Sequence, residues 1–170
     1  YLALKGEEAF ARMLGKSEDA GKARGMMDRI CANFNKIMWN GTAYRSPDYQ
    51  DLNDDRVQAL AVICGIAGKE KYEAMQKVLE KEYHVTSCFH HLVLEALMIM
   101  RRPDMALERM HRYYPTLMRE AGSTLYEQFN FGGTSNHAWS GGGFAVLSSR
   151  FAGIRPLAPG FRRFEVDPQM

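Results

Sequence analysis

Two stretches of this sequence are apolar on nearly every side of a helix, and each is followed by a stretch that is apolar on one side only. Residues 57–67 and 92–100 are the enclosed type, because a helix without a polar face must be surrounded by other elements. Residues 72–79 and 105–118 carry one apolar stripe each, so only one of their faces needs cover. The alternation predicts an all-α fold of helical hairpins, with inner and outer helices following one another.

One more helix is predicted before this alternation, and one more after it. In residues 20–38 the apolar positions recur at spacings of three and four, and Ser17 is a suitable N-cap. Residues 135–152 are rich in small side chains at first, which suits close packing inside a fold. These are six of about seven helices that we expect in all, arranged as concentric layers of a barrel or a solenoid, and no repeat in the sequence decides between these two.

The C-terminal end has a different character. Residues 153–160 are rich in glycine and proline and are predicted to be a linker, whereas residues 161–166 alternate as a short strand does. A single strand is not stable alone, so its sheet partners are expected outside this chain. The chain also starts at Tyr1 without an initiator methionine. We therefore expect a fragment whose uncovered apolar edges either self-associate or contact a missing N-terminal part.

Charge and composition exclude several classes of partner. The net charge of +2, from 22 basic and 20 acidic residues, is too small for a phosphate-binding stripe, so no nucleic acid is expected. No apolar run reaches about 20 residues, so no membrane span is expected. Cys31, Cys64 and Cys88 lie in apolar helical surroundings and predict no disulfide. His84 and Cys88 have helical ligand spacing but no obvious further ligands, so neither a metal nor a cofactor is predicted.

The candidate chemistry lies in residues 122–143, which join an outer helix to an inner one. This connection carries the carboxylate of Glu127, the imidazole of His137 and the indole of Trp139 among glycines and amides. Aromatic faces together with hydrogen-bonding groups are what a sugar requires, so a carbohydrate is the expected ligand. Tyr44 lies in another polar loop, which is expected to open on the same end of the helices and to contact the ligand.

Several segments of this chain resemble the α-L-rhamnosidases of glycoside hydrolase family 78, which belong to the six-hairpin glycosidases. The resemblance covers most of the chain. Residues 123–127, Ser-Thr-Leu-Tyr-Glu, are similar to the family segment Thr-Thr-x-Trp-Glu, and residues 135–137, Ser-Asn-His, are similar to an Asn-His segment before the last barrel helix. Supporting segments are residues 55–61, 94–97 and 153–161. The chain departs from the family in Ser123, in Tyr126 and in a short stretch between Glu127 and His137.

The resemblance implies that residues 1–153 are the C-terminal portion of an (α/α)6 barrel and that residues 154–170 begin a β-sandwich domain. It also implies hydrolysis of terminal α-L-rhamnosides with inversion, which uses one carboxyl group as general acid and another as general base. Glu127 matches the base, and His137 matches a histidine near the sugar. The general acid of the family lies upstream, so it is expected outside this chain.

Other interpretations stay open at this point. Glu127 could cap a helix or form a salt bridge, His137 could be a buried histidine bonded to loop carbonyls, and Trp139 could be a core aromatic. The scaffold could act on a different sugar, as in another six-hairpin hydrolase or lyase. It could also be a non-catalytic helical scaffold that presents a concave surface to another protein.

Overall fold

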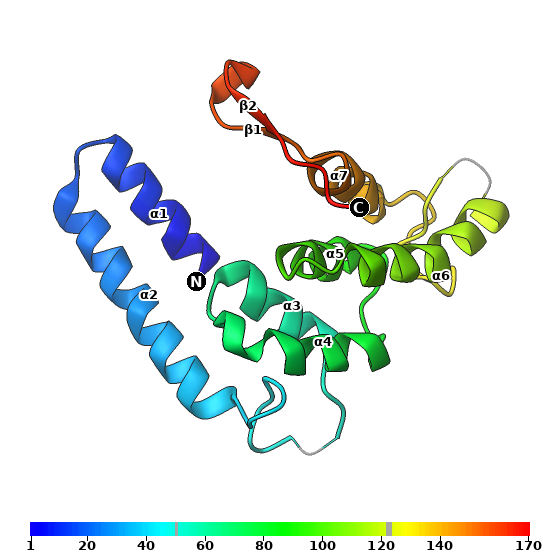
Figure 1. Cartoon of the computed structure of the whole chain (residues 1–170), viewed down its shortest axis with the longest axis horizontal. Coiled ribbons are helices and arrows are strands. Elements are labelled where there is room, and N and C mark those ends of the chain that lie inside the picture. Colours follow the sequence, from blue (N-terminus) through cyan, green and yellow to red (C-terminus); the bar gives the residue numbers. More distant parts are fainter. Residues whose placement is uncertain (50, 122–123) are drawn as a thin grey trace.

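The computed structural model describes residues 1–49, 51–121 and 124–170, in which seven α-helices precede a short β-hairpin (Figure 1). The α-helices are α1 (Leu2–Met13), α2 (Ser17–Met38), α3 (Asp55–Cys64), α4 (Tyr72–Lys81), α5 (His90–Ile99), α6 (Pro103–Ala121) and α7 (Gly142–Val146). The shorter elements are η1 (Lys69–Lys71), η2 (Ala138–Gly141), the π-helical turn η3 (Leu147–Phe151), β1 (Ile154–Pro156), η4 (Pro159–Phe161) and β2 (Phe164–Val166).

The predicted alternation of enclosed and half-covered helices is confirmed for α3 to α6. Helix α5 packs against α3, α6 and α7, and it buries residues on several sides, among them Val93, Leu94, Ala96, Leu97 and Met98. Helix α4 buries only one stripe, formed by Met75, Val78 and Leu79. The arrangement is that of part of a helical barrel domain, and a closed barrel is not seen in the described residues (Figure 1).

Helices α1 and α2 pack against each other as an antiparallel pair beside this layered core (Figure 1). Helix α1 does not stand out in the apolar pattern of the sequence. Ser17 is the first helical residue of α2 and Lys16 is the N-cap, so the N-cap prediction was wrong by one position. No helix of the described residues is both long and apolar enough to cross a membrane.

Three longer connections lead into the inner helices α3, α5 and α7, and they contact one another in chain order. The backbone N–H of His84, in the second connection, donates to Oδ1 of Asp55, which follows the first connection, at 3.3 Å. Oγ of Ser87, also in the second connection, donates to the carbonyl oxygen of Tyr126 in the third at 2.7 Å. The three connections therefore form a continuous rim at one end of the helices.

A buried ion pair supports this rim from below. Nη1 of Arg109 on α6 lies 3.1 Å from Oδ2 of Asp55 in the first turn of α3, and the two side chains are 2% and 0% exposed. Arg109 also donates to the carbonyl oxygens of Leu79 and Glu82 at the end of α4. One guanidinium thus joins an outer helix, an inner helix and the start of the second connection.

The C-terminal prediction was wrong in one respect. Strand β2 has its antiparallel partner β1 within this chain, with Ile154 opposite Val166 and Pro156 opposite Phe164. Strand β1 lies in the segment that glycine and proline content marked as a linker. Gly153, with a φ of +69°, directs the chain out of η3 and into this hairpin, and its carbonyl oxygen accepts from the N–H of Asp167.

The last helical segment also differs from its prediction over residues 135–152. Regular helix begins at Ala138 with η2, and α7 continues into the π-helical turn η3. Glycines at 141–143 weaken helix propensity at the point where η2 becomes α7. A Cβ on Gly143 would lie 2.8 Å from the hydroxyl oxygen of Tyr114, so a small residue is required for close packing there.

Candidate functional site

The connection between α6 and α7 folds back on itself and brings Glu127 beside His137. The N–H of Glu127 donates to the carbonyl oxygen of Thr134 at 3.0 Å, and the N–H of His137 donates to that of Leu125, also at 3.0 Å. A further bond, from the N–H of Gln128 to the carbonyl oxygen of Gly132, closes the tip. We call residues 124–137 the Glu127 loop.

The carboxylate of Glu127 is held on one oxygen. Oε2 accepts from the N–H and from Oγ1 of Thr134, each at 3.1 Å, and Nδ1 of His137 lies 3.9 Å away. The side chain is 36% exposed. Within the described part of the chain, Oε1 accepts no hydrogen bond and is directed to no ion-pair partner.

The surroundings of Glu127 keep its carboxylate ionised. The N–H of Thr134, then its hydroxyl, and finally the charge of His137 lower the pKa of Glu127 below its ordinary value of 4.5, against a smaller opposing effect of burial. A lowered pKa means that the group is a carboxylate at every pH above 4.5. An ionised carboxylate with one free oxygen can accept a proton from a water molecule.

An aromatic cluster holds the tip of the Glu127 loop. The ring of Phe129 stacks on Tyr113 of α6, with centroids 4.1 Å apart, and meets the edge of the His90 ring of α5 at 5.3 Å. Tyr114 of α6 lies beside both rings, with centroids 5.6 Å from His90 and 6.1 Å from Phe129. The sequence analysis did not identify this cluster. The available signal was an aromatic residue, Phe129, two positions after Glu127.

His90 is fully buried in this cluster, and neither ring nitrogen has a hydrogen-bond partner in the described residues. Burial, then the charges of Arg109 and His91, lowers the pKa of His90 from 6.5 to about 3. Between these two pH values the unfolded chain binds one more proton at this position than the folded chain does. Folding stability must therefore fall as the pH decreases from 6.5, by up to about 1.4 kcal/mol per pH unit.

We expect urea unfolding to show this loss between pH 7 and pH 5, where carboxylates with lowered pKa values are still ionised. The variant His90→Phe keeps a flat ring and has no proton to bind, so its stability should change less over the same interval. Equal changes for the two proteins would contradict the burial of a neutral imidazole at this position.

His137 lies beside the carboxylate of Glu127, and Trp139 lies beside His137. Their rings meet edge to face with centroids 5.9 Å apart, and Trp139 is 67% exposed. His137 lines a cavity of about 410 Å³ together with Thr124, Asn136 and apolar residues. This cavity offers hydroxyl, amide and imidazole groups on one side and the apolar side chains of Leu125 and Phe144 on another.

Tyr44 belongs to the same rim but not to the Glu127 loop. It is 1% exposed, its hydroxyl donates to Oδ1 of Asn35 at 2.6 Å, and its backbone exchanges hydrogen bonds with the side chain of Gln58. The structure therefore places Tyr44 in the packing beneath the first connection. Contact of Tyr44 with a ligand stays a prediction, and Glu127, His137 and Trp139 are the predicted residues that the fold brings together.

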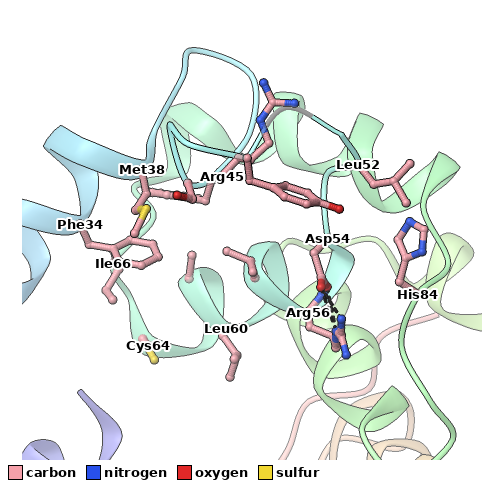
Figure 2. A pocket seen from close by; sticks show the side chains of 15 residues that line it. Phe34, Met38, Arg45, Leu52, Asp54, Arg56, Leu60, Cys64, Ile66 and His84 are labelled. Atoms are coloured by element: carbon pink, nitrogen blue, oxygen red, sulfur yellow. Dashed lines mark hydrogen bonds and ion pairs between the residues drawn. The ribbon is translucent and has the colours of Figure 1, made fainter.

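A larger cavity, of about 660 Å³, lies beside Tyr44 between α2, the first connection and α3 (Figure 2). Phe34, Met38 and Ile66 gather at one end of it, and Asp54 and His84 lie toward the other. The side chains of His137, Trp139 and Glu127 do not line it. Because His84 lines this cavity, the cavity reaches the second connection of the rim.

Gly133 allows the loop to approach the carboxylate closely. Its φ is +77°, and a Cβ there would lie 2.5 Å from Oε2 of Glu127. We expect Gly133→Ala to displace the carboxylate and to lower any activity that depends on it, in addition to about 1–2 kcal/mol of backbone strain. Gly15→Ala is the matched control, because Gly15 has a φ of +70° with open space around its Cβ position. If both variants lose stability and keep full activity, Glu127 is not positioned by this contact.

The structure describes all but one residue of the segment 123–127 that carries the resemblance. Ser123 lies outside the described residues, whereas Thr124 to Glu127 are described, and Oγ1 of Thr124 donates to Oδ1 of Asn136 at 3.0 Å. This bond joins the two similar segments, residues 123–127 and 135–137. Over the described ranges, the structure holds no cluster of three or more histidine, cysteine, aspartate or glutamate side chains that could bind a metal ion.

The comparisons with known proteins support the fold. No protein-family model matches this sequence, and no curated protein matches it either. Among solved structures, a glycoside hydrolase family 78 rhamnosidase of Bacillus sp. GL1 is similar, with a TM-score of 0.82 and 25% sequence identity. The match covers 98% of this chain and 20% of that chain, so this chain spans about one fifth of the length of that rhamnosidase. The likeness supports the helical fold of this chain.

Proposed function

We propose that this chain is part of an α-L-rhamnosidase-type glycoside hydrolase, in which the Glu127 carboxylate activates the attacking water. The observation that carries the proposal is the state of Glu127: an ionised carboxylate, held on one oxygen by Thr134 and free on the other, on the rim of the helices. In an inverting glycosidase the base removes a proton from water as that water attacks the anomeric carbon.

The neighbours of Glu127 suit this role. His137 lies 3.9 Å from the carboxylate, close enough to hydrogen-bond a sugar hydroxyl held at the same place. Trp139 lies beside His137 and is largely exposed, so an indole face is accessible for the C–H face of a pyranose. The likeness to part of a rhamnosidase of the same fold adds support for a glycoside substrate.

An inverting mechanism needs a second carboxyl group, about 6.5–9.5 Å from the first. We propose that this general acid comes from chain outside the residues described, and that residues 1–153 form the C-terminal portion of a barrel domain followed by a β-domain from residue 154. Exposed apolar side chains support a contact with further chain, either the rest of the barrel or a second copy. They include Phe10, Met13 and Leu14 at the end of α1 and Trp139 and Phe144 near α7.

The direct test is hydrolysis of 4-nitrophenyl α-L-rhamnoside by the protein that carries this chain, followed by proton NMR. The β-anomer of rhamnose is expected as the first product, because inversion changes the configuration of the α-linkage. A panel of other 4-nitrophenyl glycosides tests whether the same scaffold acts on a different sugar. Hydrolysis with retention would refute the proposed inverting mechanism. No hydrolysis of any member of the panel would refute the proposed function and favour a non-catalytic helical scaffold.

A further inference from the structure

Two buried serine hydroxyls contact the two backbone carbonyl groups on either side of the Cα atom of Glu127. Oγ of Ser87 lies 2.7 Å from the carbonyl oxygen of Tyr126 and 2.5 Å from that of Glu127. Oγ of Ser140 lies 2.7 Å from the carbonyl oxygen of Tyr126 and 3.2 Å from Oγ of Ser87. The two serines are 1% and 0% exposed, so bulk water does not compete for their hydroxyl groups.

The number of protons determines how these groups pair. Each hydroxyl has one proton to donate, and two carbonyl oxygens need a donor. If Ser140 donates to Tyr126 and Ser87 donates to Glu127, both carbonyl groups are satisfied and neither hydroxyl proton is left over. Removal of either hydroxyl leaves one donor for two part-buried carbonyl oxygens, and a carbonyl oxygen that loses its donor without gaining water destabilises the loop.

The two serines come from elements other than the loop they hold. Ser87 lies in the connection that leads into α5, and Ser140 lies in η2, directly before α7. The N–H of Ser140 also donates to the carbonyl oxygen of His137 at 3.0 Å. Ser140 therefore joins the backbone at Tyr126 to the backbone at His137, which sets the distance between the carboxylate and the imidazole.

We infer that Ser87 and Ser140 are positioning residues, which tie the backbone of Glu127 to two inner helices and so fix the carboxylate relative to His137 and the substrate. The inference rests on the proposed function and goes beyond it, since neither serine touches the substrate or the reacting atoms. A rigid support of this kind matters because a shift of about 1 Å in a catalytic group can lower a rate about 100-fold.

The test is steady-state hydrolysis of 4-nitrophenyl α-L-rhamnoside by Ser87→Ala, Ser140→Ala and the double variant of the protein that carries this chain. We expect each single variant to lower kcat about tenfold with little change in KM, as partial loss of this support predicts. The acidic limb of the kcat/KM profile should also move to higher pH, because a loosened loop weakens the bonds from Thr134 that keep Glu127 ionised. The double variant should lose less than the product of the single losses, since both hydroxyls hold the backbone of the same residue, Glu127, and contact each other.

Thr86→Val is the matched control. Its hydroxyl lies in the same connection but contacts Sγ of Cys88, at 3.1 Å, and not the Glu127 loop. We expect Thr86→Val to keep parental kcat and the parental pH profile. If Ser87→Ala does not fold, Ser140→Ala tests the same contact from the side of η2.

The outcomes distinguish the positioning role of the two serines from the proposed function. If Glu127→Gln abolishes hydrolysis while both serine variants keep parental kcat and pH profile, the positioning role is refuted and the proposed function stands. If Glu127→Gln keeps parental turnover, the assignment of Glu127 as the base is wrong, whatever the serine variants do. A loss of melting temperature in a serine variant without any change in kcat or in the pH profile shows a purely structural role and also overturns the inference.

Discussion

Glu127→Gln is expected to lower kcat on a rhamnoside by about 10²–10⁴-fold, the range that general acid–base catalysis supplies. Glutamine keeps the size of the side chain, and its amide oxygen can still accept the two hydrogen bonds from Thr134. It cannot take a proton from water at neutral pH. Binding of substrate depends on other contacts, so KM should change far less than kcat.

The pH profile provides a second measurement of the same role. Because its neighbours lower the pKa of Glu127 below 4.5, the base is active above that pH and is lost as the pH decreases through its lowered pKa. The acidic limb of kcat/KM for the parental protein should therefore lie below pH 4.5. Glu73→Gln removes a charge from an exposed position on α4 and serves as the control, with parental kinetics expected. Near-parental turnover of Glu127→Gln would assign the base to another residue.

The largest effect on stability is expected from Arg109→Met. Removal of this guanidinium leaves the carboxylate of Asp55 buried without its partner, and loss of one member of a buried ion pair costs about 3–5 kcal/mol. The carbonyl oxygens of Leu79 and Glu82 lose a donor as well. Urea unfolding at pH 7 measures the change.

Lys77→Met is the matched control, because Lys77 and Glu73 form an exposed pair on α4 for which about 0.3–0.5 kcal/mol is expected. The double variant Asp55→Asn with Arg109→Met should recover part of the loss, since it removes the unpaired charge. If Arg109→Met costs no more than Lys77→Met, the buried pair does not stabilise the rim. The second connection, which contains Ser87, should then keep its position in the Arg109→Met variant.

Much of the helical architecture could be predicted from the sequence because periodicity reports burial directly. A helix with no polar face must be enclosed, and this reasoning found α3 and α5 within a few residues of their ends. Boundaries were less accurate where the local signal conflicts with the fold. The helix predicted over residues 135–152 begins at Ala138 and is divided into η2, α7 and η3, with the glycines at 141–143 where η2 becomes α7. The strand pair β1–β2 was missed because a proline, Pro156, occupies one of its strands.

The candidate site was predictable as a set of residues within one connection, but not as a geometry. Glu127, His137 and Trp139 stand out by residue type and by resemblance, and the fold does bring their side chains together. Tyr44 has an equally suitable residue type in another connection of the same rim. Its hydroxyl is satisfied by Asn35 in the packing of α2, a contact that no local pattern announces.

The sequence by itself determined which helices are enclosed and which connection carries the candidate residues, since both follow from local spacing and residue type. Only the tertiary structure decided what holds Glu127 in place: Thr134 on its carboxylate, Phe129 among the rings of α5 and α6, and two serines on its backbone. These partners are distant in the chain, and a hydrogen bond or ring contact between distant residues depends on how whole helices pack. The propensity of each residue alone does not predict that packing.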